Sequence, residues 1–248
     1  KEIILIAQDI TRYGEDIYGQ DSLYKLITKL LTISDLKWLR LMYSYPENIS
    51  LELIELIAKE KRICNYLDLP IQHSSNKIRK KMYRRGSREE LIELIANLRK
   101  QIPDIVLRTS LIVGFPGESK EDFADLLSFV REIKFDRLGV FKYSKEEETA
   151  AASFKGHLTD DIKTQRYNQI MQAQQEIAFN NNQKYIGQEL EVIIDEINKD
   201  TALGRTQYDA PEIDNQVYIP ATDFSVGEII RANIKEAYEY DLIGELKK

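Results

Sequence analysis

The sequence predicts an α/β protein in which a partial parallel (β/α) half-barrel is followed by a small antiparallel β-barrel of the OB type. Apolar runs alternate with amphipathic helical stretches over residues 1–158, and a long polar helix follows over residues 159–186. Residues 187–248 hold only short alternating runs, broken by Gly, Pro, Asn and Asp. A chain of 248 residues also exceeds the usual size of one domain. We therefore expect two unequal domains joined by a helix.

Five apolar or β-branched runs in the first domain have the character of buried strands. They are residues 3–7, 38–42, 66–71, 106–113 and 138–141. Amphipathic stretches between them predict helices that carry the chain from one strand to the next, which makes the strands parallel neighbours. The side chains that act on ligands in such folds gather at the carboxyl ends of the strands.

Helix boundaries are marked by capping signals. Ser87 stands three residues before Glu90, and Ser119 stands three residues before Asp122, so each serine can accept a bond from a free helical N–H. The long polar helix is expected to end before Gly187.

Five short runs after Gly187 indicate a closed barrel. They are residues 190–194, 202–205, 217–219, 229–234 and 242–246. This part holds 14 acidic and 6 basic side chains, a net charge of −8, whereas the remainder is at +2, which together restore the −6 of the whole chain. An acidic barrel would repel RNA and attract a basic protein. The alternative is a surface that serves only solubility.

Composition indicates a soluble globular protein, with 43% hydrophobic and 31% charged residues and no apolar run long enough to span a bilayer. The single cysteine, Cys64, excludes an internal disulfide, and no secretory signal opens the chain. We expect a cytoplasmic protein without a membrane partner.

Several motifs resemble those of the radical S-adenosylmethionine methylthiotransferases. They are IAQDIT at residues 6–11, YLDLPIQH at 66–73, RTSLIVGFPGE at 108–118, GRT at 204–206 and DAPEID at 209–214. The resemblance covers nearly the whole chain and is greatest to the RimO type, in which the terminal barrel, called a TRAM domain, is acidic. The tRNA-modifying relatives carry a more basic barrel, so tRNA is the less expected partner.

The resemblance implies a set of contacts with S-adenosylmethionine. These residues are Gln8, Asp9, Gln72, His73, Arg84, Leu111, Val113, Gly114 and Phe115. Gly114 would let the adenine approach the backbone. The alternatives are a helix-capping role for Asp9 and an ordinary strand-turn-helix at residues 108–118.

The family also uses two 4Fe-4S clusters, whose ligands this chain lacks. One thiol cannot hold a cluster, so the CxxxCxxC motif and the second cluster's domain are expected upstream of Lys1, and the chain alone is expected to be inactive. Cys64 is expected to be a buried apolar residue. His73 and His157 lack the spacing of a metal site. Glu148 stands where related chains have glycine, before Thr149, which leaves the local geometry open.

The implied activity is the addition of a methylthio group to the β-carbon of an aspartate in small-subunit ribosomal protein twelve. The barrel would bind this basic protein through Arg205, Asp209, Glu212 and Asp214, unless residues 209–214 form a turn only. A tRNA methylthiotransferase and a binding module without catalysis are the alternatives. Finally, the strand at residues 3–7 is expected at an exposed sheet edge that promotes association.

Overall fold

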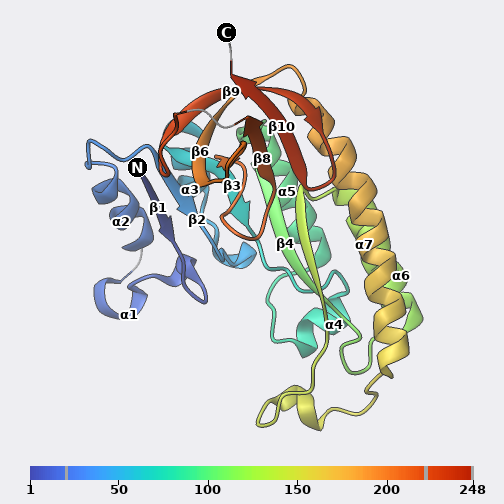
Figure 1. Cartoon of the computed structure of the whole chain (residues 1–248). Helices are drawn as coiled ribbons and strands as arrows, with labels where there is room; N and C mark the ends of the chain where they lie inside the picture. The colour runs from blue at the N-terminus through green and yellow to red at the C-terminus, as the bar shows by residue number, and fades with distance from the viewer. Residues whose placement is uncertain (20–21, 221–222, 247–248) are drawn as a thin grey trace.

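A parallel sheet forms the first domain of the computed structural model, which describes residues 1–19, 22–220 and 223–246. Its strands lie in chain order, β1 to β5, and every pairing is parallel (Figure 1). Their bounds are β1 Glu2–Leu5, β2 Trp38–Leu41, β3 Ile63–Asp68, β4 Val106–Val113 and β5 Arg137–Lys142. The predicted half-barrel sheet is confirmed.

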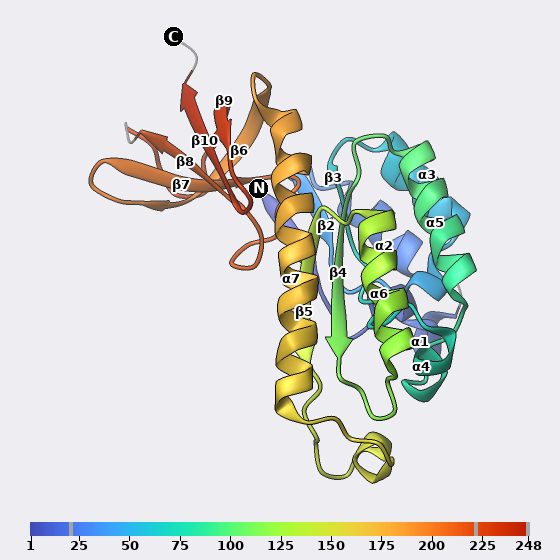
Figure 2. The same ribbon diagram turned by 90° about the vertical axis from the view of Figure 1, so that its right-hand side faces the viewer.

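Helices cover one face of this sheet, and the small barrel lies on the other (Figure 2). The helical elements of the first domain are η1 Ile10–Arg12, α1 Glu15–Tyr18, α2 Ser22–Leu30, η2 Pro46–Asn48, α3 Leu51–Lys59, α4 Asn76–Lys81, α5 Arg88–Gln101, α6 Lys120–Ile133 and η3 Ala150–Ser153. Both predicted capping boxes are present, Ser87 with Glu90 and Ser119 with Asp122. Leucine and isoleucine side chains between the helices and the sheet form the main core.

The long helix α7, Asp160–Asn182, does more than connect the domains. It runs beside β5 and α6 (Figure 2), and Ile170 and Ile177 join the main core. At its end, Asn182 Nδ2 donates to Tyr238 O at 2.7 Å, which ties the helix to the barrel. Among the described residues, no helix has both the length and the apolar character needed to cross a membrane.

The second domain is a closed barrel that follows η4, Gln183–Tyr185. Its strands are β6 Glu189–Ile197, β7 Thr201–Thr206, β8 Gln216–Pro220, β9 Ile229–Ala237 and β10 Asp241–Leu246, in the order β10-β8-β7-β6-β9. The predicted closed barrel is confirmed: four of its pairings are antiparallel, and only the pairing of β10 with β8 is parallel among the described strands. An odd number of strands cannot alternate in direction all the way around a closed ring, so at least one parallel pair is required.

The barrel packs on the amino-terminal half of the sheet's concave face. Trp38, Cys64 and Tyr66 from the sheet form an apolar cluster with Ile193 and Ala210 from the barrel. The carboxyl-terminal half of the same face lies beyond this contact. Phe141 near the end of β5 is 57% exposed there, and Ile6 just after β1 is 64% exposed. The open side of the sheet is therefore the one where the strands end.

Ion pairs border the apolar contact between the domains. Arg137 donates to Asp209 at 2.7 Å, and the side chains are 5% and 1% exposed. Asp214 accepts from Tyr66 Oη at 2.6 Å and lies 3.5 Å from Arg108 Nε. These charges are buried in pairs, which offsets the cost of removing them from water.

The strand β1 is at the edge of the sheet and pairs only with β2 among the described strands. Its Glu2 side chain is covered, because it binds Arg40 at 3.0 Å and also Arg205 of the barrel. The association expected through this edge stays a prediction.

Candidate cofactor and substrate site

A cleft of about 840 Å³ opens where β1 and β2 end. Gln8 and Asp9 lie along it after β1, Tyr45 contributes from the segment after β2, and Tyr83 and Arg85 close it from the segment after α4. The parallel strands bring these distant segments to one edge, as the fold predicts. Two of the predicted cofactor residues, Gln8 and Asp9, therefore meet in a real cleft.

Charges of both signs line this cleft. Asp9, Glu15, Asp16 and Glu47 supply carboxylates, whereas Arg12 and Arg85 supply guanidinium groups, and Arg12 pairs with Glu15 at 3.0 Å. Asp9 also accepts from the backbone N–H of Thr11 at 3.0 Å, so its capping role is present as well. A cleft with both signs suits a ligand that carries an ammonium and a carboxylate group, such as an amino acid.

Arg84 lines a neighbouring hollow of about 670 Å³. Its guanidinium carbon lies 4.1 Å from the centre of the Tyr45 ring, a cation–π contact, and its Nη1 has no hydrogen-bond partner in the described part of the chain. Lys80, Tyr83 and Arg85 line the same hollow.

Near the end of β4, the side chains expected to contact the cofactor do not face the open side of the sheet. Leu111 and Val113 have no exposed surface and belong to the main core under the helices. Ile112 alternates to the other face and is partly buried beside Phe115. Strand alternation, which was available from the sequence, would have selected Ile112 instead of its two neighbours.

Gly114 is needed for a close contact within the protein. Its φ is +77°, and an added Cβ would lie 2.4 Å from Lys163 Cγ of α7. Lys163 Nζ donates to Tyr143 O at 2.8 Å, which fixes this lysine over the turn. The approach of α7 is a structural reason for this glycine, and the expected approach of an adenine stays a prediction.

The turn after Gly114 is closed by a buried carboxylate. Glu118 accepts from the backbone N–H groups of Gly114 and Phe115, and it pairs with Arg166 of α7 at 2.7 Å. Burial raises the pKa of Glu118, and Arg166 opposes this rise. The Phe115 ring packs edge-on against Tyr143, with ring centres 5.3 Å apart.

Gln72 and His73 follow β3 and differ in exposure. Gln72 has a φ of +67° and is partly buried, and its backbone bonds to Ser110 and Ile112 extend the pairing toward β4. His73 has no exposed surface, and its Nδ1 accepts from the backbone N–H of Ser75 at 2.9 Å. Burial lowers the pKa of His73 to about 3, so the ring is neutral at physiological pH.

Of the four predicted partner-binding residues, Arg205 and Asp209 are buried, and Asp214 is partly buried with a side chain that is 2% exposed. Arg205, Asp209 and Asp214 are held in the contact between the domains, because their charges pair with Glu2, Arg137 and Arg108. A buried side chain cannot line a docking surface, so a surface role remains only for Glu212, which is exposed. Sequence reasoning missed the partners of these charges, since the pairs join residues far apart in the chain.

Cys64 is 1% exposed, as expected for a small apolar core residue. Burial raises the pKa of its thiol to about 11, so it is not a thiolate. No group of three or more His, Cys, Asp or Glu side chains within residues 1–19, 22–220 and 223–246 could hold a metal ion. The residues present do not fit an iron–sulfur cluster.

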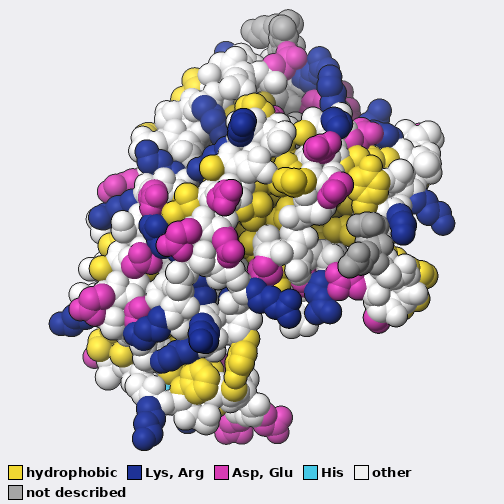
Figure 3. Space-filling view, turned by 180° about the vertical axis from the view of Figure 1, so that it is seen from behind, with side chains coloured by type: hydrophobic (Ala, Val, Ile, Leu, Met, Phe, Trp, Pro, Cys, Tyr) yellow, Lys and Arg dark blue, Asp and Glu magenta, His cyan; other side chains and the backbone are white. Residues whose placement is uncertain are grey.

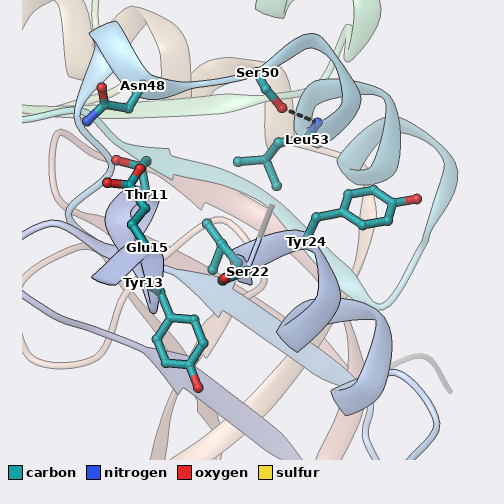
Figure 4. A pocket seen from close by; sticks show the side chains of 9 residues that line it. Thr11, Tyr13, Glu15, Ser22, Tyr24, Asn48, Ser50 and Leu53 are labelled. Carbon is teal, nitrogen blue, oxygen red and sulfur yellow. Dashed lines mark hydrogen bonds between the residues drawn. The ribbon is translucent and has the colours of Figure 1, made fainter. Parts of the chain in front are cut away.

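A smaller hollow of about 310 Å³ lies between η1, α2 and the start of α3 (Figure 4). Its serine hydroxyl groups serve the chain's own backbone: Ser50 accepts from Leu53 N at 3.2 Å, and Ser22 donates to Gly19 O. The predicted cofactor residues are not among its lining, but it adjoins the cleft described above, because Glu15 and Asn48 line both.

Comparison with models of known protein families identifies the family of this chain. The model of the radical SAM superfamily matches residues 7–130. The chain belongs to the radical SAM superfamily. A TRAM domain model matches residues 186–246, which are the closed barrel.

Curated relatives confirm the resemblance to the RimO type. The chain is 50% identical to "Ribosomal protein uS12 methylthiotransferase RimO" of Geobacter sulfurreducens over 99% of the chain and 56% of the relative. It is 49% identical to the protein of the same name from Natranaerobius thermophilus, again over 99% of the chain and 56% of the relative. The chain thus spans about half the length of these relatives.

Among solved structures, SuiB of Streptococcus suis aligns with a TM-score of 0.46 and 18% identity, over 69% of this chain and 35% of that one.

Proposed function

We propose that this chain is the cofactor-holding and docking part of a cytoplasmic methylthiotransferase that modifies an aspartate of ribosomal protein uS12. The observation that carries the proposal is the 50% identity to a protein named for this activity, which extends over both domains. The cleft at the ends of β1 and β2 supports it, because it lies where a parallel half-barrel places its ligands.

The cleft fits the methionyl end of S-adenosylmethionine. Asp9 would face its ammonium group, and Arg12 would face its carboxylate. The ring of Tyr45, held against Arg84, would close one side and exclude water. When bound, S-adenosylmethionine supplies the radical source and the methyl group of this chemistry. The role of the protein is to hold it against the substrate carbon.

The iron–sulfur clusters would have to be held by residues other than those of this chain, since its one thiol is buried and protonated. We therefore assign no step of the reaction to a cluster bound here, and the chain by itself should be inactive.

The acidic barrel would bind the basic ribosomal protein by charge complementarity. Its exposed carboxylates are the candidates: Glu212 in the segment after β7, Glu196 in the last part of β6, and Asp200 in the turn before β7. These side chains replace the buried Asp209 and Asp214 as candidates for the docking surface.

The test uses the full natural polypeptide that contains this chain, with its clusters reconstituted anaerobically. Reductant, sulfide and S-adenosylmethionine are added, and uS12 and tRNA are offered separately. A mass increase of one methylthio group on an aspartate of uS12 is the expected result. Modification of tRNA alone would move the protein to the tRNA-modifying branch, and the charge argument would be wrong.

A further inference from the structure

The segment after β3 carries a dense group of cations. Residues 77–88 hold seven Lys and Arg side chains and no Asp or Glu. Some of these have structural partners: Lys77 pairs with Asp122, Arg88 pairs with Glu132, and Arg79 is buried and donates to backbone carbonyls. A run of charged residues is usually only a solvated surface. Whether this one can bind a ligand depends on the remaining four cations.

Those four cations, Lys80, Lys81, Arg84 and Arg85, have no ion pair with any described carboxylate. We call them, together with Tyr83, the basic corner. The acidic residues that follow are already engaged, since Glu90 caps α5 and Glu89 accepts from Asn76. No ion pair therefore neutralises the basic corner within the part of the chain that the structure describes, although Arg85 also lines the cleft that holds Asp9 and Glu47.

The basic corner also has the shape of a binding surface. The hollow of about 670 Å³ is lined by Lys80, Arg84 and Arg85 together with Tyr83, and none of its lining residues is acidic. Figure 3 shows Lys and Arg side chains close together in the lower part of the helix-covered face, beside exposed hydrophobic side chains.

Tyr83 is the unusual member of this group. It is 78% exposed, the largest exposed fraction among the large hydrophobic side chains, and its φ is +55°. A tyrosine that lies in the left-handed region and contributes little to the core has no packing reason to be there. An exposed aromatic ring between unpaired cations is the arrangement with which proteins bind single-stranded nucleic acid, by base stacking and phosphate contacts.

We propose that the basic corner binds single-stranded RNA, with phosphates on Lys80, Lys81 and Arg85 and a base stacked on Tyr83. The inference goes beyond the proposed function, because it gives the radical domain an RNA contact of its own. If both proposals hold, the chain contacts its protein substrate and RNA at the same time. The acidic barrel would face the protein, and the basic corner would face the RNA.

The test is fluorescence anisotropy of the 248-residue chain with a labelled oligouridylate of about 12 nucleotides. We expect the logarithm of the binding constant to fall with the logarithm of salt concentration with a slope of roughly −2 to −3, from three to four phosphate contacts. Neither a cluster nor uS12 is needed, so failure here leaves the proposed function untouched.

The variant Lys80→Glu/Arg85→Glu should weaken binding at least about tenfold. The matched control is Lys61→Glu/Lys100→Glu, which changes the net charge equally at two exposed lysines outside any described ion pair. This control should stay within about twofold. Equal losses in both variants, or no binding by the unchanged chain at low salt, would overturn the proposal.

Tyr83→Ala should weaken binding about tenfold, and Tyr83→Phe should retain it, because stacking needs the ring and not the hydroxyl group. Equal binding by Tyr83→Ala and the unchanged chain would show that no base stacks on Tyr83. A competitor poly-glutamate that displaces the RNA at the same charge concentration would show a general anion surface instead, which also contradicts the proposal.

Discussion

The two ends of the sheet's strands differ in their exposed charge, although the open end also holds one buried pair, Glu118 with Arg166. At the end covered by the barrel, Arg137 and Asp209 are almost fully buried and are paired with each other. At the open end, Lys80 and Arg85 are exposed and have no ion pair among the described residues. Buried charges need partners for the fold to be stable, whereas exposed charges cost little and stay available for ligands. The covered end therefore holds the domains together, and the open end is the place for function.

The largest expected effect is at the covered end. Asp209→Ala leaves the Arg137 guanidinium buried without its carboxylate, and we expect a loss of about 3–5 kcal/mol in the free energy of unfolding, measured in urea. Lys59→Ala is the control, because Lys59 and Glu55 form an exposed pair worth about 0.5 kcal/mol or less. A loss below about 1 kcal/mol for Asp209→Ala would mean that the buried pair does not hold the domains together.

A smaller effect is expected where α7 meets the open end. Gly114→Ala should lose about 2–3 kcal/mol, because it combines a left-handed backbone with a contact to Lys163. In a Lys163→Ala background the clash with Cγ is gone, the Cβ contact at 3.3 Å stays, and about 1 kcal/mol of backbone strain should remain. Double-mutant cycles in urea measure this coupling. Equal losses in both backgrounds would show that the contact with Lys163 is not the reason why the position needs a glycine.

The smallest expected effect comes from His73, which is buried beneath the open end. Its titration should lower the free energy of unfolding by about 2 kcal/mol at pH 5. Its folded pKa of about 3 is below the unfolded value of 6.5, so protonation favours the unfolded state. Stability should be full above pH 6.5 and fall as the pH drops toward 3.

His73→Asn keeps an acceptor for Ser75 N and does not titrate, so its stability should fall less over the same pH range. Thermal unfolding of both proteins at pH 7 and pH 5 measures the difference. Parallel curves would show that another group controls the acid response.

Sequence reasoning predicted local features well and long-range pairs poorly. Residues 106–113 were predicted as a strand and form β4 with the same bounds, because the run is apolar and β-branched. The strand β3 begins at Ile63, three residues before the predicted start, since Asn65 interrupts the apolar run. The docking assignments at Asp209 and Asp214 assumed exposed side chains, and only the packing of the barrel on the sheet reveals their burial.

The same limit applies to the cofactor site. Gln8 and Asp9 could be placed from the strand-end rule, but Tyr45 and Tyr83 enter the cleft from segments whose proximity depends on the folded chain. Leu111 and Val113 were assigned to the cofactor site by resemblance to a motif. Side chains alternate between the two faces of β4, and those of Leu111 and Val113 point into the core.

The most direct test of the contrast between the two ends is amide chemical-shift mapping of the labelled chain. Oligouridylate and S-adenosylmethionine are added in turn, and neither titration requires a cluster. We predict shifts confined to the ends of the strands, with Asp9, Tyr83 and Arg85 among them, and unchanged amides at Arg205, Asp209 and Asp214. Shifts concentrated in residues 204–214 would place ligand binding at the covered end and contradict the account.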